Sequence, residues 1–208
     1  MALLLAAAPA GEGDRRFAAG DYAGALSAYA EAVAAHPEAP EVPEWLLKMA
    51  RCHLKLGRPW LAEVRLRRLV QDDLETRAGA EAVALLDRLL EGRGRPAEAL
   101  HLAERLLARH PSRARPALLA MRARALARLG RPQEAARAWA AARDAAPEAE
   151  RPALEAEVER WLAGRPELFL RWVIREFDTR FPSDYALLAL IDRYRERQPE
   201  LAGRLVEE

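Results

Sequence analysis

Apolar residues recur along most of the chain at the spacing of amphipathic α-helices, and short polar turns separate these stretches. In residues 22–36, Leu26, Tyr29, Ala32 and Val33 fall on one helical face. No stretch alternates β-branched and polar residues as a half-buried strand would. The pattern therefore predicts an all-α protein. The predicted helices span residues 12–19, 22–36, 43–56, 59–72, 75–91, 96–110, 115–129, 132–146, 151–163, 166–180 and 183–197.

One short turn motif occurs five times between these helices. It reads Gly-Asp-Tyr at 20–22 and Gly-Arg-Pro at 57–59, 94–96, 130–132 and 164–166, so that its glycines are 37, 37, 36 and 34 residues apart. A glycine just past a helix can adopt the left-handed conformation, and a proline suits the first turn of the next helix. The arginine before the proline is pushed out of the helical region. Each copy should therefore end one helix, turn the chain and start another. Only the fifth copy has Phe169 where the others have alanine.

The motif divides the chain into helix pairs of similar length. One amphipathic pair cannot bury its apolar face alone, but stacking on a neighbouring pair buries it. We therefore predict an array of about five pairs. Trp161, Phe169, Trp172 and Phe177 make the fifth pair aromatic, and Ser183 is a candidate N-cap for a last, capping helix.

These pairs resemble tetratricopeptide repeats, whose unit of about 34 residues sets small and large apolar residues at fixed positions. The matching positions include Gly13, Ala50 and Ala123 as small residues of the first helix, Ala25, Ala62, Ala99 and Ala135 as small residues of the second, Tyr29, Leu66 and Trp139 as large ones, and Pro37, Pro111 and Pro147 as closing prolines. The chain departs from the family pattern at Leu74, Asp87, Ala103 and Arg122.

The resemblance implies a right-handed α–α superhelix of about five helix pairs with a C-terminal capping helix. The repeats would span about 12–40, 41–74, 75–111, 114–147 and 149–182, with the capping helix in 183–208. Residues 1–11 would be a flexible N-terminus or the remnant of a signal peptide, because a short apolar run precedes Ala8-Pro9-Ala10 but no basic region does. A cytoplasmic and an exported, periplasmic location both stay open.

Composition narrows the class of partner. The chain is 51% hydrophobic and 31% charged, with a net charge of +1. Nucleic-acid-binding domains carry a clear basic excess, so we do not expect nucleic acid as the partner. No run approaches the roughly 20 apolar residues that span a bilayer. Cys52 is the only cysteine, so the chain can form no internal disulfide, and its apolar helix predicts a buried thiol.

The sequence offers no recognisable catalytic or metal site. Ser27, Ser112 and Ser183 lie in no nucleophile motif. His53 adjoins Cys52, but adjacent helical residues diverge and no further ligand spacing supports a metal. We therefore expect no enzyme activity and no cofactor. His36 and His110, which precede closing prolines, are candidate helix C-caps.

Basic residues at equivalent repeat positions form the candidate site. Arg51, Arg88 and Arg124 each lie six residues before a turn glycine. The resemblance places this position in the concave groove, and the same reading adds Lys48, Lys55 and Arg128 to its lining. Arginine pairs with carboxylates through a planar fork, so we expect an acidic segment or a C-terminal carboxylate as ligand. The alternative is that these arginines are solvated or paired with Glu44, Glu81 or Glu91.

Two further features bear on the ligand. The asparagines of the carboxylate clamp found in some family members cannot be present, because the chain contains no asparagine. Trp60 directly follows a turn and would be either an exposed binding anchor or, as we expect, buried against the next repeat. Trp45, Trp139, Trp161 and Trp172 fit core positions.

These observations predict a protein–protein interaction scaffold or adaptor that binds a peptide or partner segment in its concave groove. One alternative is a regulatory or activator module of the bacterial cell envelope, since Ala/Arg-rich arrays with an aromatic end are similar to envelope repeat proteins. Another is a structural module that associates with itself, which an apolar patch on the last helix would favour.

Overall fold

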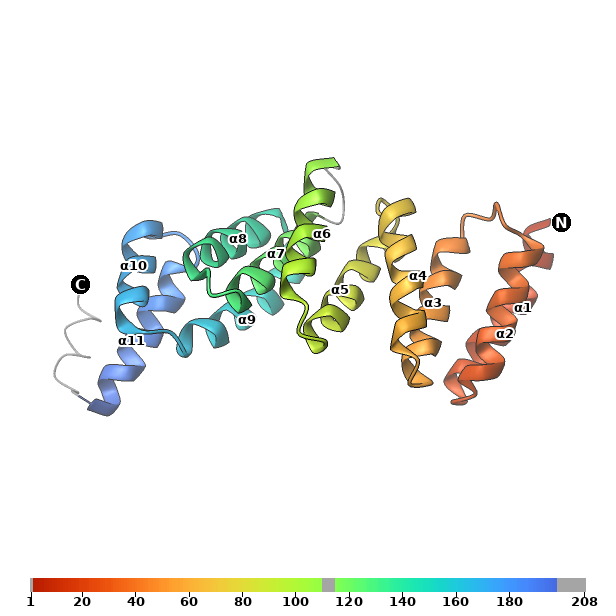
Figure 1. The fold of residues 1–208 in the computed structure, drawn as a ribbon, viewed down its shortest axis with the longest axis horizontal. Helices are drawn as coiled ribbons and strands as arrows, with labels where there is room; N and C mark the ends of the chain where they lie inside the picture. Colours follow the sequence, from red (N-terminus) through yellow and green to blue (C-terminus); the bar gives the residue numbers. More distant parts are fainter. Residues whose placement is uncertain (1, 110–114, 198–208) are drawn as a thin grey trace. The chain divides into compact units, whose positions relative to one another are not determined.

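The structure is a computed structural model that describes residues 2–109 and 115–197. Within these residues all regular secondary structure is helical (Figure 1). The elements are α1 (Ala2–Ala18), α2 (Tyr22–Ala35), α3 (Val42–Lys55), α4 (Pro59–Asp72), α5 (Arg77–Gly92), α6 (Pro96–Arg109), α7 (Arg115–Arg128), α8 (Pro132–Ala145), a 3₁₀ turn (Glu148–Glu150), α9 (Arg151–Ala163), α10 (Glu167–Phe177) and α11 (Ser183–Arg197). The predicted all-α class is confirmed. His110, Pro111 and Ser112 lie outside the described residues.

Two helices differ from the prediction beyond a residue or two. Helix α1 begins at Ala2, where the sequence predicts a flexible N-terminus or a signal remnant over 1–11. Alanine and leucine dominate that run, and both are strong helix formers. Helix α10 ends at Phe177 because Asp178 takes a positive φ of 53°, which stops the helix before the predicted Arg180.

The Gly-Arg-Pro turn works as predicted in three of its four copies. Gly57, Gly94 and Gly130 have φ of 68°, 64° and 72°, in the left-handed region. In the first of these, the amide of Arg58 donates to the carbonyl of His53 at 2.9 Å and the amide of Gly57 donates to Leu54 at 3.1 Å. This pair of bonds is the Schellman motif, and the next helix starts at the following proline.

The fifth turn does not follow the rule. Gly164 has a φ of −87°, and α10 starts at Glu167, with Pro166 before the helix instead of inside it. The prediction of a left-handed stop at this glycine is therefore wrong. Ser183 is likewise not the N-cap of the last helix: it is the first residue of α11, and its hydroxyl donates to the carbonyl of Asp178.

The chain divides into two compact units, residues 1–117 (unit 1) and 118–208 (unit 2). Unit 1 contains α1 to α6, and unit 2 contains most of α7 together with α8 to α11. In unit 1 each helix from α1 to α5 packs against the helix that follows it in the chain, and in unit 2 α8 packs against α9 and α10 against α11, as in an α–α solenoid (Figure 1).

Unit 1 is closely packed at the small residues that mark the repeat. Ala25 and Ala62 are fully buried where paired helices approach each other. Gly13 of α1 lies under the ring of Tyr29, so that a Cβ there would sit 2.6 Å from the ring. The Tyr29 hydroxyl donates to Asp14 at 2.6 Å, which ties α2 to α1. These contacts confirm Gly13, Ala25 and Ala62 as small sites and Tyr29 as a large one.

Unit 2 ends in a set of aromatic contacts. The ring of Phe169 meets Trp161 edge-on and stacks on Trp172, and Trp172 meets Phe177 edge-on, with centroids 5.6, 5.6 and 6.2 Å apart. Helix α11 packs against both α9 and α10 and covers this end. Trp139 is buried as predicted, but Trp161 and Trp172 are only partly buried.

Candidate functional site

The first helices of the pairs in unit 1 share a charged surface. We call it the first-helix face: the side of α1, α3 and α5 that carries Asp14, Lys48, Arg51 and Glu81. The ammonium of Lys48 lies 2.7 Å from Asp14, and the guanidinium of Arg51 lies 2.7 Å from Glu81. Each ion pair joins neighbouring first helices. Arg51 therefore pairs with an internal carboxylate, Glu81, which is the alternative to a free groove arginine that the sequence left open.

Two predicted site residues on this face have no such counter-ion. Lys55 follows Lys48 and Arg51 along one side of α3, and Arg88 lies two turns beyond Glu81 on α5. Both are exposed, and neither has an ion pair or side-chain hydrogen bond within residues 2–109 and 115–197. On the first-helix face, they are the predicted site residues that a ligand can reach without displacing an internal partner.

The remaining predicted site residues belong to unit 2. Arg124 of α7 donates two hydrogen bonds to the carboxylate of Glu157 on α9, at 2.6 and 2.7 Å. Its guanidinium also lies over the indole of Trp139, 5.4 Å from the centroid. Arg128 is exposed at the end of α7. Arg51 and Arg88 are thus held in one unit and Arg124 in the other.

Trp60 is exposed, not buried. Its exposed fraction is 61%, and Val64, one helical turn later on α4, is equally exposed. The expectation that Trp60 packs against the next repeat is therefore wrong. Its position directly after a turn was the only sign of exposure in the sequence.

Glu63 of α4 is a buried carboxylate that several arginines contact, and it is not among the predicted site residues. Glu63 is 8% exposed and accepts hydrogen bonds from Arg67 at 2.8 and 3.0 Å, Arg93 at 2.5 Å and Arg95 at 2.9 and 3.1 Å. Arg67 and Arg95 also pair with Glu98 of α6. Burial would raise the pKa of Glu63, but hydrogen bonds from Arg67 and Arg95 and their charges hold it below its ordinary value.

A sequence signal for this network exists in the repeat register. Glu63 lies six residues after its turn glycine, where the other repeats have Leu26, Leu100, Ala136 and Leu170. A carboxylate at a normally apolar position needs partners, and here they come from the turn between α5 and α6.

His53 and Cys52 are buried side by side on α3, but they form no metal site. Both ring nitrogens of His53 lack a hydrogen-bond partner, and burial, followed by the charges of Arg65 and Arg58, lowers its pKa. Burial raises the pKa of Cys52 to about 11, so its sulfur stays a thiol. The described part of the chain contains no cluster of ligands that could hold a metal ion.

A polar pocket of about 670 Å³ lies in unit 2 between α8, α9 and the start of α11. Its charged walls are largely paired with one another: Arg137 lies 2.7 Å from Glu176, and Arg143 lies 3.0 Å from Glu155. The ring of Phe181 lies under the Arg143 guanidinium. Such internal pairing makes this pocket less able than the first-helix face to select a ligand by charge.

Among the described helices, none has both the length and the apolar character required to cross a bilayer.

No curated protein matches the chain. Two crystal structures of MamA are similar to it. The first has a TM-score of 0.57 and 18% sequence identity, and the match covers 93% of this chain and 95% of that chain. The second has a TM-score of 0.55 and 19% sequence identity, and the match covers 88% of this chain and 96% of that chain. TTC0263, a thermophilic TPR protein of Thermus thermophilus, is 23% identical with 97% of both chains covered and a TM-score of 0.44.

The likeness to MamA supports the helical-repeat fold alone, because the identities are low. Family membership rests on the sequence itself. Models of the tetratricopeptide repeat match residues 16–89 and 88–150, which together span more than half of the chain. The matched segments include the turns at Gly20, Gly57, Gly94 and Gly130, all of which have a positive φ. The chain belongs to the tetratricopeptide repeat family.

Proposed function

We propose that this protein is an interaction scaffold that binds an acidic segment of a partner protein along its first-helix face. The general role, a scaffold for protein partners, follows from its family. The finer proposal rests mainly on one observation: Lys55 and Arg88 are exposed on this face without an internal counter-ion in the described chain. Lys48 and Arg51 complete the proposed basic lining of this face, and Arg124 and Arg128 of unit 2 stay predicted binding residues.

The ion pairs of Lys48 and Arg51 do not oppose this role. The side chains of Arg51 and Glu81 are 40% and 36% exposed. Solvent-exposed ion pairs contribute about 0–1 kcal/mol, so a ligand carboxylate can replace Glu81 at little cost. The pair with Glu81 holds the Arg51 side chain in an extended conformation that suits a forked contact with a carboxylate.

The repeat geometry suits an extended ligand. Packed helices lie roughly 8–10 Å apart, and an extended peptide rises about 3.3 Å per residue. A carboxylate at about every third residue could therefore meet the cations of successive first helices. We accordingly expect a spaced acidic segment to bind better than a single terminal carboxylate.

Fluorescence anisotropy with a labelled oligoglutamate peptide of about ten residues, roughly 33 Å when extended, tests this proposal. The double variant Lys55→Glu/Arg88→Glu should weaken binding at least tenfold. The matched control Arg105→Glu/Arg175→Glu changes net charge equally, at exposed arginines of α6 and α10, and should have a much smaller effect. Equal weakening by both variants would show unspecific attraction and contradict the proposal. Free and amidated C-termini on the peptide separate side-chain from terminal carboxylate recognition.

Self-association is a second candidate, favoured by exposed leucines on the last helices. Leu168 of α10 is 83% exposed and Leu188 of α11 is 51% exposed. Light scattering over a range of protein concentrations tests it. A mass that rises with concentration in the wild type, but not in Leu168→Glu/Leu188→Glu, would support a self-associating module. A constant monomer mass would exclude it over that range.

A further inference from the structure

The exposed apolar pair on α4 is specific to the second repeat. Trp60 and Val64 lie three and seven residues after Gly57. The residues at the first of these positions in the other repeats are Ala23, Ala97, Gln133 and Glu167, and those at the second are Ser27, His101, Arg137 and Arg171. The fold is thus built with small or polar residues at these outward positions. Packing does not explain a tryptophan and a valine here, since both are 61% exposed.

The two side chains form one surface. A separation of four residues places them on the same side of the helix, one turn apart. Exposed apolar residues that occur singly need no explanation, but a tryptophan with a neighbouring valine offers a contiguous anchor. Tryptophan is among the residues that contribute most to binding energy at interfaces.

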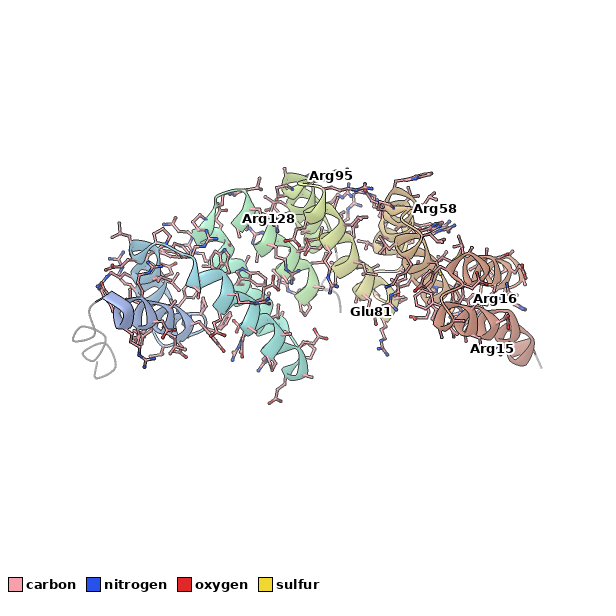
Figure 2. All side chains as sticks on the ribbon, turned by 90° about the horizontal axis from the view of Figure 1, so that it is seen from below. Arg15, Arg16, Arg58, Glu81, Arg95 and Arg128 are labelled. Atoms are coloured by element: carbon pink, nitrogen blue, oxygen red, sulfur yellow. The ribbon has the colours of Figure 1, made fainter. Side chains whose placement is uncertain are left out.

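Arginines are frequent on α4, which carries this pair, and in the turn that contacts α4 through Glu63. The segment 58–68 and the turn 93–98, joined through Glu63, contain six arginines and two glutamates. Asp72 adds a third carboxylate through its pair with Arg68. Figure 2 shows Arg58 and Arg95 toward one edge of unit 1 and Glu81, on the first-helix face, toward the opposite edge. The surface is therefore basic and separate from the first-helix face.

Glu63 orders some of these arginines by accepting their hydrogen bonds. Glu63 follows Trp60 by three residues on α4, so the two are neighbours on the helix surface. Its hydrogen bonds hold the guanidinium groups of Arg67, Arg93 and Arg95 in place around the Glu63 carboxylate. Side chains that are already ordered lose less conformational entropy when a ligand binds.

We propose that this Trp60–Val64 surface docks an amphipathic helix of a partner protein, which sets large apolar side chains on Trp60 and Val64 and carboxylates against the surrounding arginines. Charge complementarity selects this occupant. A single-stranded nucleic acid would also stack on an indole, but Glu63, Glu98 and Asp72 lie among the arginines and would repel its phosphates. A protein ligand can alternate its charges to suit this mixture.

The test uses the full chain labelled with 5-fluorotryptophan. The resonance of Trp60 is the one of five tryptophan signals that Trp60→Phe removes. The probe is a synthetic helical peptide with leucines four residues apart, flanked by glutamates. We expect the Trp60 signal to shift on titration, and Trp60→Ala/Val64→Ala to weaken binding at least tenfold. A peptide with lysines in place of the glutamates should not bind.

Matched controls separate this surface from others. Leu168→Ala/Leu188→Ala truncates two exposed apolar residues of unit 2 and should leave the affinity unchanged, as should Lys55→Glu/Arg88→Glu. Loss of binding in the latter would mean that the peptide occupies the first-helix face, and would overturn the proposal. So would no binding at about 1 mM peptide, tighter binding of single-stranded DNA at Trp60, or a dimer that Trp60→Ala abolishes. Failure of the oligoglutamate experiment would leave this proposal standing.

Discussion

Arg95, the arginine of the third turn motif, donates two hydrogen bonds to the buried carboxylate of Glu63 in the preceding repeat, at 2.9 and 3.1 Å. The same arginine contributes its backbone amide to the end of α5, since that amide donates to the carbonyl of Leu90 at 3.0 Å. One residue thus closes its own turn and holds the neighbouring repeat. We infer that Glu63 stabilises the packing of α4 against the turn before α6.

Glu63→Ala should therefore destabilise unit 1. The change leaves Arg67, Arg93 and Arg95 without their shared acceptor, at a cost of about 1–3 kcal/mol. Hydrogen exchange followed by mass spectrometry should show faster exchange in α4 to α6. Glu98→Ala, whose side chain is 36% exposed, should have a smaller effect. Equal effects of the two substitutions would contradict a special role for Glu63.

Acid should destabilise unit 1 through His53. Burial lowers the pKa of His53 below its ordinary value of 6.5, so the folded state favours the neutral ring. The unfolded chain takes up the proton first as the pH falls. The stability contributed by the neutral ring is therefore complete above about pH 6.5 and is lost below it. Urea unfolding between pH 8 and 5 should show a decline that His53→Leu reduces.

The exposed histidine His101 provides the control for that experiment. His101→Gln should keep the decline with pH seen in the wild type. If His53→Leu and the wild type lose stability in parallel, the buried ring does not account for acid sensitivity.

The turn glycines should differ in their tolerance of a side chain. Gly57 has a φ of 68°, and an L-residue in the left-handed region costs roughly 1–2 kcal/mol. Gly164 has a φ of −87° and open space around it, so alanine there should be neutral or stabilising by up to about 1 kcal/mol. Thermal unfolding of Gly57→Ala and Gly164→Ala checks this contrast. A loss at Gly164 as large as at Gly57 would refute it.

Two glycines of α1 offer a second matched pair. A Cβ at Gly13 would sit 2.6 Å from the Tyr29 ring, whereas nothing lies within 4 Å of a Cβ at Gly11. Gly13→Ala should cost about 1–3 kcal/mol through overpacking, and Gly11→Ala should stabilise the helix by roughly 0.5–1 kcal/mol. Urea midpoints of the two variants distinguish these outcomes, and a stabilised Gly13→Ala would show that Tyr29 does not pack there.

Local signals in the sequence are sufficient for most of the fold. Helical periodicity and the Gly-Arg-Pro turn each act within a few residues, so helix order and the starts of α4, α6 and α8 follow directly. The turn at Gly164 has the same Gly-Arg-Pro sequence, but its glycine does not have a positive φ. A tripeptide alone does not force a glycine into the left-handed region, because the packing of the flanking helices also decides the turn.

The candidate site was less predictable because its contacts join separate repeats. The register of Arg51 and Arg88 is a property of the sequence, but the Glu81 carboxylate that meets Arg51 comes from the next repeat. The partners of Glu63 in the turn before α6 lie some 30 residues away. Exposure of Trp60 depends on whether a neighbouring helix covers it, which periodicity does not reveal.

The central claim is that an acidic partner segment binds on the first-helix face. A photoreactive amino acid at position 84, one turn before Arg88 on α5, reports contact there, and one at the exposed position 108 of α6 serves as the control. The account predicts that labelled oligoglutamate cross-links at position 84, that Lys55→Glu/Arg88→Glu abolishes the product, and that position 108 gives little. Equal or stronger cross-linking at position 108 would contradict it.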